Sequence, residues 1–386
     1  MKNVHYIGFY SKADNPQNFR NFPASKTKMD YIISSLKTAD FKVTLLALGE
    51  TLSQNKLYKQ RVQVCDQNEK IIYVGTFSNS FFILKYLSRV WLLVQLLYYL
   101  LFVVEKNGNV LYYHSHATMS IVKISRFFKK FNLILEVEEI FQAAWRGSEK
   151  KINSEINYLK KADGYIFVND IMPQKFVINN KPFAICYGDY RITNNINRTV
   201  VNNEEEIKLV YAGVFGGENS DVSLAIDVIN FLPEKFQLHI LGYGTDKDIA
   251  YIKNKIELIN NKACNIRVHY HGKLSGRKYM NFLSTCHIGL STRVLEDRFS
   301  DYTFPSKVLV YLGNNLKTVS SSINCIVKSK IADSIYFYKN AVPQDVAETI
   351  LSIDFTDKSK GNQIDLLNKL DFEFINQIRN VLNYKA

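Results

Sequence analysis

The sequence predicts a two-domain α/β protein with a parallel sheet in each domain. Short apolar runs of strand length alternate with amphipathic stretches of helical length through almost all of the 386 residues. A polar stretch at 193–206, TNNINRTVVNNEEE, interrupts this alternation near the middle, and its Asn, Thr and Glu content cannot bury a core. We therefore expect a first domain over 1–192, a linker over 193–206 and a second domain over 207–386.

The expected elements follow from these patterns in chain order. In the first domain we expect strands at 4–9, 42–47, 70–74, 110–113, 132–136, 164–168 and 183–187, and helices including 26–39, 80–106, 118–131 and 148–161. In the second domain we expect strands at 208–213, 237–241, 266–269, 288–291, 317–320 and 334–337, and helices at 221–230, 246–260, 275–284, 305–313, 323–331 and 343–352. One or two helices over 362–384 close the chain. Parallel sheets bind ligands beyond the carboxyl ends of their strands, so candidate residues are sought there.

Composition excludes some classes of protein. With 47% hydrophobic residues, 17 glycines and 7 prolines, the chain is neither disordered nor collagen-like. The formal net charge is +13, and the chain up to Tyr190 holds 25 basic and 15 acidic residues. Most of the excess thus lies in the first domain, which we expect to face an anionic partner. Nucleic acid is not expected, because no recognition module appears.

The cysteines and the amino terminus indicate a cytoplasmic location. No CxxC pair or zinc spacing occurs, so reduced thiols are expected at Cys65, Cys186, Cys264, Cys286 and Cys325. The amino terminus has no signal-peptide pattern.

Glycine-rich turns follow three strands of the second domain. Gly213, Gly216 and Gly217 follow the first strand, Gly242 and Gly244 the second, and Gly272 the third. A turn without side chains lets backbone N–H groups approach a phosphate. Such glycines also occur in ordinary turns, where they permit a positive φ.

The segment from Val210 to Val319 resembles the two-domain GT-B glycosyltransferases, specifically the family-4-like group that builds bacterial capsule, exopolysaccharide and O-antigen. Its most specific part is Thr303-Phe304-Pro305-Ser306-Lys307, which precedes an amphipathic helix. Proline suits a first helical turn, serine offers a hydroxyl, lysine supplies a cation, and a helix start favours an anion. The resemblance implies two Rossmann-like domains that face each other across a cleft.

The resemblance implies a donor site at the strand ends of the second domain. The residues expected to bind the nucleotide-sugar donor, UDP- or GDP-linked, are Gly216, Gly217, Gly242, Tyr243, Lys273, Leu274, Arg293, Thr303, Pro305, Ser306 and Lys307. Three positions depart from the group. Val310 stands where its members carry an acid for the donor ribose, Tyr302 replaces a second acid, and 214–220 contains no Arg or Lys.

The first domain resembles the acceptor side of such enzymes over 22–48, at His114 and His116, and over 133–147. We expect Glu138, Glu139 and His116 to be catalytic. A carboxylate there can act as general base on an acceptor hydroxyl or stabilise the charge that develops on the donor sugar. The histidines can alternatively make structural hydrogen bonds. A metal pair has no third ligand placed by the sequence, so no metal is expected, and no redox cofactor is required.

The most apolar run, 90–104, lies in the expected helix 80–106 and is shorter than a membrane-spanning segment. The helix is either a buried crossover helix or an exposed helix that docks on anionic lipid with help from neighbouring Lys and Arg. The second case suits an enzyme that extends a polyprenyl-diphosphate-linked saccharide at the inner face of the plasma membrane.

The sequence therefore predicts a glycosyltransferase that moves a sugar from a nucleotide-sugar donor to a glycan or lipid-linked acceptor in surface polysaccharide synthesis. Two alternatives stay open, a GT-B-type nucleotide-sugar epimerase and a non-catalytic partner subunit.

Overall fold

The computed structural model describes residues 1–12, 15, 17–20, 22–54, 57–77, 81–176, 180–192, 206–216, 221–262, 265–293, 298–355 and 363–384. The chain forms two compact units. Unit 1 contains Met1–Asp189 and Phe372–Ala386, and unit 2 contains Tyr190–Asp371. The predicted linker at 193–206 lies outside the described residues except for Glu206.

Unit 1 is built on an eight-stranded sheet with the order β3-β4-β2-β1-β5-β6-β7-β8. The strands are β1 (Lys2–Phe9), β2 (Phe41–Leu48), β3 (Arg61–Asp66), β4 (Glu69–Tyr73), β5 (Asn109–Tyr113), β6 (Asn132–Val137), β7 (Gly164–Phe167) and β8 (Phe183–Ile185). All neighbours are parallel except β3 and β4. Our expectation of a purely parallel sheet is wrong at this edge, where the Asn68 amide donates to the Asp66 carboxylate (2.7 Å) inside a tight turn. Val62 and Val64 alternate with polar residues in this short strand, but almost all of it is exposed and it was not predicted.

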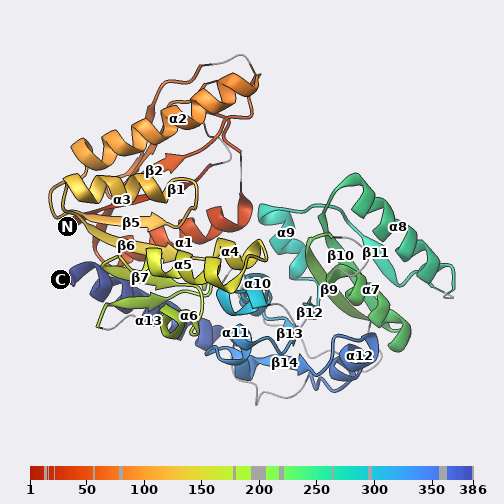
Figure 1. The fold of residues 1–386 in the computed structure, drawn as a ribbon. Helices are drawn as coiled ribbons and strands as arrows, with labels where there is room; N and C mark the ends of the chain where they lie inside the picture. Colours follow the sequence, from red (N-terminus) through yellow and green to blue (C-terminus); the bar gives the residue numbers. More distant parts are fainter. Residues whose placement is uncertain are drawn as a thin grey trace. The chain divides into compact units, whose positions relative to one another are not determined.

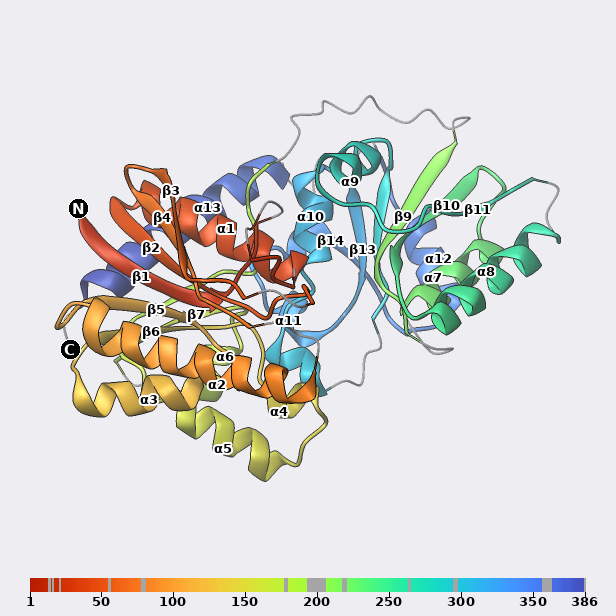
Figure 2. The same cartoon turned by 90° about the horizontal axis from the view of Figure 1, so that it is seen from above.

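Helices cover both faces of this sheet (Figures 1 and 2). Helix α1 (Pro23–Thr38) and helix α13 (Gln363–Asn383) lie on one face, and α2 (Phe82–Tyr98), α3 (Met119–Phe128) and α5 (Glu149–Leu159) lie on the other. Helix α2 continues into a π-helical turn, Tyr99–Val103. Two short helices, α4 (Phe141–Ala144) and α6 (Met172–Phe176), complete the unit and were not predicted.

The end of the chain returns to unit 1, which corrects the predicted second domain over 207–386. The Phe374 ring stacks on Tyr31 of α1 at 5.6 Å. The Ile185 amide donates to the Gln377 side chain at 2.9 Å. These contacts bury the apolar side of α13 against unit 1, so apolar periodicity identified the helix but not the sheet that it covers.

Unit 2 has a six-stranded parallel sheet with the order β11-β10-β9-β12-β13-β14. Its strands are β9 (Ile207–Val214), β10 (Phe236–Tyr243), β11 (Val268–Tyr270), β12 (Ile288–Ser291), β13 (Lys317–Ser321) and β14 (Ile335–Tyr338). Helices α7 (Asp221–Asp227), α8 (Asp246–Asn260) and α12 (Pro343–Leu351) bury the larger apolar cluster on one face. Helices α9 (Gly276–Leu283) and α10 (Lys307–Gly313) bury a smaller one on the other face, and α11 (Asn324–Val327) follows β13.

Candidate functional site

The glycine turns of unit 2 lie together at the carboxyl ends of β9, β10 and β11. The Gly242 amide donates to the Gly272 carbonyl (2.9 Å), and the Phe215 amide donates to the Tyr243 carbonyl (2.7 Å). A Cβ on Gly242 would lie 2.0 Å from the Gly213 carbonyl oxygen, so only glycine fits. We expected Gly242 to offer its amide to a phosphate. Its N–H is instead hydrogen-bonded to Gly272, so this residue joins the turns to each other. Gly216 is exposed in the same turn, and Gly217 lies outside the described residues.

Lys307 lies at the start of α10 and faces the end of β9. Its Nζ is 4.2 Å from the centroid of the buried Tyr211 ring. Burial lowers the pKa of the Lys307 ammonium to about 8; the Asp221 carboxylate opposes this shift and the Arg293 guanidinium adds to it. No described carboxylate lies within ion-pair distance of the Lys307 ammonium. A half-buried cation without an ion pair is suited to bind an anion.

Arg293 and Asp221 come to Lys307 from neighbouring elements. Arg293 follows β12, where its backbone N–H and carbonyl both bond to the Tyr338 hydroxyl, at 3.1 and 3.2 Å. Asp221 begins α7, and its carbonyl accepts from the Thr292 hydroxyl at 2.6 Å. The sequence predicted Lys307 and Arg293, whereas Tyr211 and Asp221 were missed because nothing in their local pattern distinguishes them from a core tyrosine and a helix-start acid.

The other predicted donor residues occupy different positions in unit 2. Lys273 and Tyr243 pair with each other, with the ammonium 4.6 Å from the ring centroid. Leu274 and Val310 are partly buried and pack against the smaller apolar cluster. Near α10, Thr303 and Pro305 are half-buried and Ser306 is exposed, with no capping bond from the serine hydroxyl.

In unit 1, the predicted Glu138 is ion-paired with a lysine that the sequence did not single out. Lys28, buried on α1, lies 2.5 Å from Glu138 Oε1 and donates to the Cys186 carbonyl at 2.6 Å. Burial raises the pKa of Glu138, and the Lys28 charge only partly opposes that effect. The pKa of Lys28 is itself raised, because the nearby carboxylates outweigh the effect of burial. A buried ion pair of this kind holds the ends of β6 and β8 together.

Glu136 lies beneath Glu138 on the same side of β6 and is fully buried. Its carboxyl group accepts a hydrogen bond from the Tyr6 hydroxyl. Burial and the neighbouring Glu138 charge raise its pKa to about 8, so Glu136 is mostly protonated at neutral pH. With Glu136 neutral, Lys28 and Glu138 balance each other and the cluster carries no net charge.

Glu139 is the predicted carboxylate that stays available. It directly follows Glu138 past the end of β6, is half-buried and has no hydrogen bond or ion pair with another described residue. Burial, followed by repulsion from Glu138 and Glu155, raises its pKa. A half-buried carboxylate with a raised pKa is the ordinary form of a general base or acid.

The two predicted histidines differ. His114 is buried and its Nε2 lies 3.0 Å from Glu155 Oε1, and the Glu155 carboxylate also accepts from the Phe141 and Gln142 amides. His114 therefore fixes the start of α4, which is the structural alternative. His116 is exposed, and its ring lies edge-on to Trp145 at 5.3 Å. The exposed Trp145 offers an apolar face next to a ring nitrogen, an arrangement suited to a sugar. His116 makes no hydrogen bond to Glu138 or Glu139 within the described part of the chain.

Within the described ranges, no group of three or more His, Cys, Asp or Glu residues is arranged to hold a metal ion. The described cysteines, Cys65, Cys186, Cys286 and Cys325, are free thiols.

Comparison with known proteins identifies the fold. No protein-family profile and no curated protein sequence matches the chain. Solved structures match it over nearly its whole length at low sequence identity. The trehalose-6-phosphate synthase OtsA has a TM-score of 0.70 at 11% identity, with 100% of both chains covered. The UDP-forming trehalose-phosphate synthase of Burkholderia xenovorans, solved with glucose-6-phosphate, has a TM-score of 0.65 at 10% identity, with 98% of both chains covered.

A third match is HepE of Anabaena in complex with UDP, with a TM-score of 0.62 at 11% identity and 98% of both chains covered. The chain has the GT-B glycosyltransferase fold. The predicted fold class is confirmed. At these identities the likeness concerns the fold, and the roles of the residues are argued from their own chemistry.

Proposed function

We propose that this GT-B protein is a glycosyltransferase that moves a sugar from a UDP- or GDP-linked donor to a glycan or lipid-linked saccharide in surface polysaccharide synthesis. The observation that carries the proposal is the Lys307 ammonium, which is half-buried at the carboxyl edge of a GT-B sheet and has no ion pair with a carboxylate that the structure describes. The family-4-like pattern around Lys307 supports a polysaccharide enzyme of that group.

In this proposal unit 2 holds the donor. Lys307 and Arg293 neutralise the diphosphate, which leaves as charge develops on it. Asp221 keeps Lys307 protonated at neutral pH by opposing the effect of burial. The pair formed by Lys273 and Tyr243 flanks the glycine turns and would contact the nucleotide.

Unit 1 supplies the acceptor chemistry. Glu139 takes the proton of the acceptor hydroxyl or stabilises the positive charge that develops on the donor sugar. Glu138 positions the end of β6 through Lys28. His116 and Trp145 bind the acceptor saccharide by hydrogen bonding and stacking.

The apolar helix supports a bilayer as the place of action. The described residues contain one helix, Phe82–Val103, whose length and apolar composition would allow it to cross a membrane. It connects β4 to β5 of one sheet, and a spanning helix would separate these strands. We infer that it lies along an anionic bilayer instead. Its apolar exposed side chains, with those of the adjacent α3, include Phe82, Ile83, Tyr86, Leu87, Val90, Val94, Tyr98, Ile124, Phe127 and Phe128.

Two basic residues of α3 and its end, Arg126 and Lys129, are engaged in contacts within unit 1 and are not available to lipid. Arg126 Nη2 donates to both carboxylate oxygens of Asp163, at 2.8 and 2.9 Å, and Lys129 donates to the Leu101 carbonyl at 2.7 Å. Exposed cations that remain on this part of unit 1 are Lys123, Lys130, Lys150, Lys151 and Lys161. Sedimentation with vesicles rich in anionic lipid tests this contact, and protein that stays in solution at low salt would exclude it.

A non-catalytic partner subunit is the second candidate. Val310 packs into the apolar cluster at the position where the family-4-like group carries its ribose acid, so this contact to the donor is lost. Transfer of labelled sugar to a membrane lipid extract separates the candidates. An enzyme releases nucleoside diphosphate in step with product, and a partner subunit does not.

Donor binding is tested by titration with UDP and GDP at pH 7. Lys307→Met keeps the apolar stem of the side chain and removes the charge, so affinity should fall about tenfold to a hundredfold. The matched control is Lys247→Met, an exposed lysine on α8 of the same unit. Equal affinities in the two variants would remove Lys307 from the donor site.

A further inference from the structure

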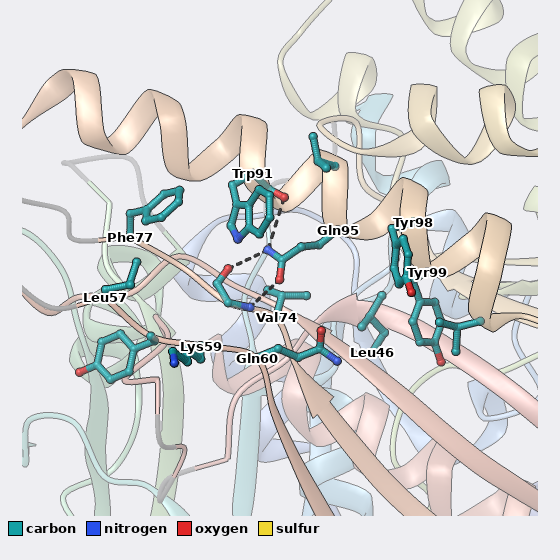
Figure 3. Close-up of a pocket in the computed structure, with 14 residues that line it drawn as sticks. Leu46, Leu57, Lys59, Gln60, Val74, Phe77, Trp91, Gln95, Tyr98 and Tyr99 are labelled. Atoms are coloured by element: carbon teal, nitrogen blue, oxygen red, sulfur yellow. Dashed lines mark hydrogen bonds between the residues drawn. The ribbon is translucent and has the colours of Figure 1, made fainter.

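An apolar cavity of about 470 Å³ lies under α2 in unit 1 (Figure 3). Its roof is formed by Trp91, Val94 and Tyr98 of α2. Its floor is formed by the ends of β2 and β4, at Leu46 and Val74. The volume lies within the range of small-molecule sites, roughly 300 to 1,000 Å³.

The cavity exists because α2 is held above the sheet by a polar contact. Gln95 is the polar residue within the apolar run, and its side chain makes two hydrogen bonds to the Gly75 backbone, at 2.7 and 2.8 Å. These bonds satisfy the polar atoms of both groups. Leu92 and Leu96 are buried, whereas Trp91, Val94 and Tyr98 are only partly covered. The walls therefore offer carbon surface and few unsatisfied polar groups.

The mouth of the cavity is continuous with the apolar surface proposed to meet the bilayer. Val94 and Tyr98 line the cavity and are also 46% and 60% exposed. Leu57, which is 65% exposed, also lines the cavity. Lys59 is the cation among the described lining residues. A ligand of this cavity is thus apolar, reaches it from the bilayer side and can carry an anionic group next to Lys59.

We propose that the cavity binds the hydrocarbon chain of a phosphate-bearing prenyl lipid, the carrier of the acceptor saccharide. The inference rests on the proposed function for the identity of the acceptor. Burial of the chain against Trp91, Val94 and Tyr98 supplies the affinity, because each methylene removed from water strengthens binding about fourfold. Lys59 selects lipids with an anionic head.

Trp91 makes the binding directly measurable. The chain has two tryptophans, so Trp145→Phe leaves Trp91 as the single reporter inside the cavity. Titration with farnesyl phosphate below its micelle concentration should give a saturable change in Trp91 emission. Geranyl phosphate, which is one isoprene unit shorter, should bind at least tenfold more weakly, and inorganic phosphate should give no change.

A matched pair of variants on α2 tests the location. Val94→Phe narrows the cavity and should lower the affinity for farnesyl phosphate at least tenfold. Val90→Phe adds the same bulk to the same helix outside the cavity, so the affinity for farnesyl phosphate should not change. Leu57→Asp, at the exposed mouth, is a second variant that disturbs no core and should also weaken binding.

Equal affinity in all three variants would show adsorption to the helix surface and overturn the proposal. A change in Trp91 emission of equal size on titration with inorganic phosphate would also overturn the proposal. The assay contains no sugar nucleotide, so its failure is distinct from failure of the proposed function. If the protein binds UDP and transfers sugar but does not bind farnesyl phosphate, only the lipid-binding role of the cavity is overturned. If it binds the lipid but transfers no sugar, the proposed enzymatic function is overturned.

Discussion

The two units solve the problem of a buried charge in opposite ways. In unit 1 the Lys28 ammonium is paired with Glu138 at 2.5 Å, and the pKa of Glu136, raised to about 8, keeps that carboxyl neutral. In unit 2 the Lys307 ammonium has a tyrosine ring for a neighbour and no carboxylate at ion-pair distance among the described residues. The charges of the first cluster balance within the protein, and we propose that the charge at Lys307 is balanced when an anion binds.

This difference assigns separate roles to charges that look alike in the sequence. A lysine compensated inside the fold stabilises it, and a lysine left uncompensated costs stability until a ligand arrives. By the same reasoning we propose that Glu138 is a positioning residue and that Glu139, which has no hydrogen bond or ion pair with another described residue, is the candidate catalytic carboxylate.

The largest effect is expected from Glu139→Gln. The variant should fold normally and lose about 10²- to 10⁴-fold in turnover, with little change in donor affinity, because it removes only a proton acceptor. The control is Glu149→Gln, an exposed acid at the start of α5. Unchanged turnover in a sugar-transfer assay would remove Glu139 from the mechanism.

The next effect is on stability and tests the pairing in unit 1. Glu138→Gln leaves the Lys28 ammonium buried without its partner, so the free energy of unfolding should fall by about 3–5 kcal/mol in urea. Adding Lys28→Met to this variant should restore most of the loss, since no buried charge then remains. Additive losses in the double variant would contradict the pairing.

A smaller effect follows from the raised pKa of Glu136. The folded state holds this proton up to about pH 8, whereas an unfolded glutamate, with its ordinary pKa of 4.5, releases it at a much lower pH. Between these values the folded state binds more protons, so the free energy of unfolding falls as pH rises, by about 1.4 kcal/mol per pH unit. Glu136→Gln should remove this slope. Parallel pH profiles for the variant and the unaltered protein would contradict the assignment.

The sequence predicted the order of the elements well where a strand or helix buries one face. Strands β9, β10, β12 and β13 were found by their apolar pattern, and the segment 304–307 at the start of α10 was found by its resemblance to the family-4-like group. Strand β3 was missed because it is a short edge strand whose two alternating valines, Val62 and Val64, are exposed and bury no core face. Helix α13 was placed in the wrong domain, because its partner Tyr31 lies far away in the sequence.

Some residues of the candidate site could be singled out from the sequence, because they stand in a recognisable local pattern. Lys307, Glu138 and Glu139 follow strand ends and stand out in the sequence. Lys28 and Asp221 did not, since a lysine within a helix and an acid at a helix start are ordinary there. Which carboxylate is paired and which lysine is unpaired depends on contacts between distant elements, and no local pattern records these.

The central claim is that the uncompensated ammonium of Lys307 is the receptor for a nucleotide diphosphate. The most direct test is the affinity for UDP from pH 7 to pH 9. Because burial lowers the pKa of Lys307 to about 8 in the free protein, affinity should fall as pH rises and approach a tenfold loss per unit above pH 8. Lys307→Met should bind UDP weakly and show only the titration of the ligand itself. A profile for the unaltered protein that matches the variant, or no UDP binding at pH 7, would contradict the account.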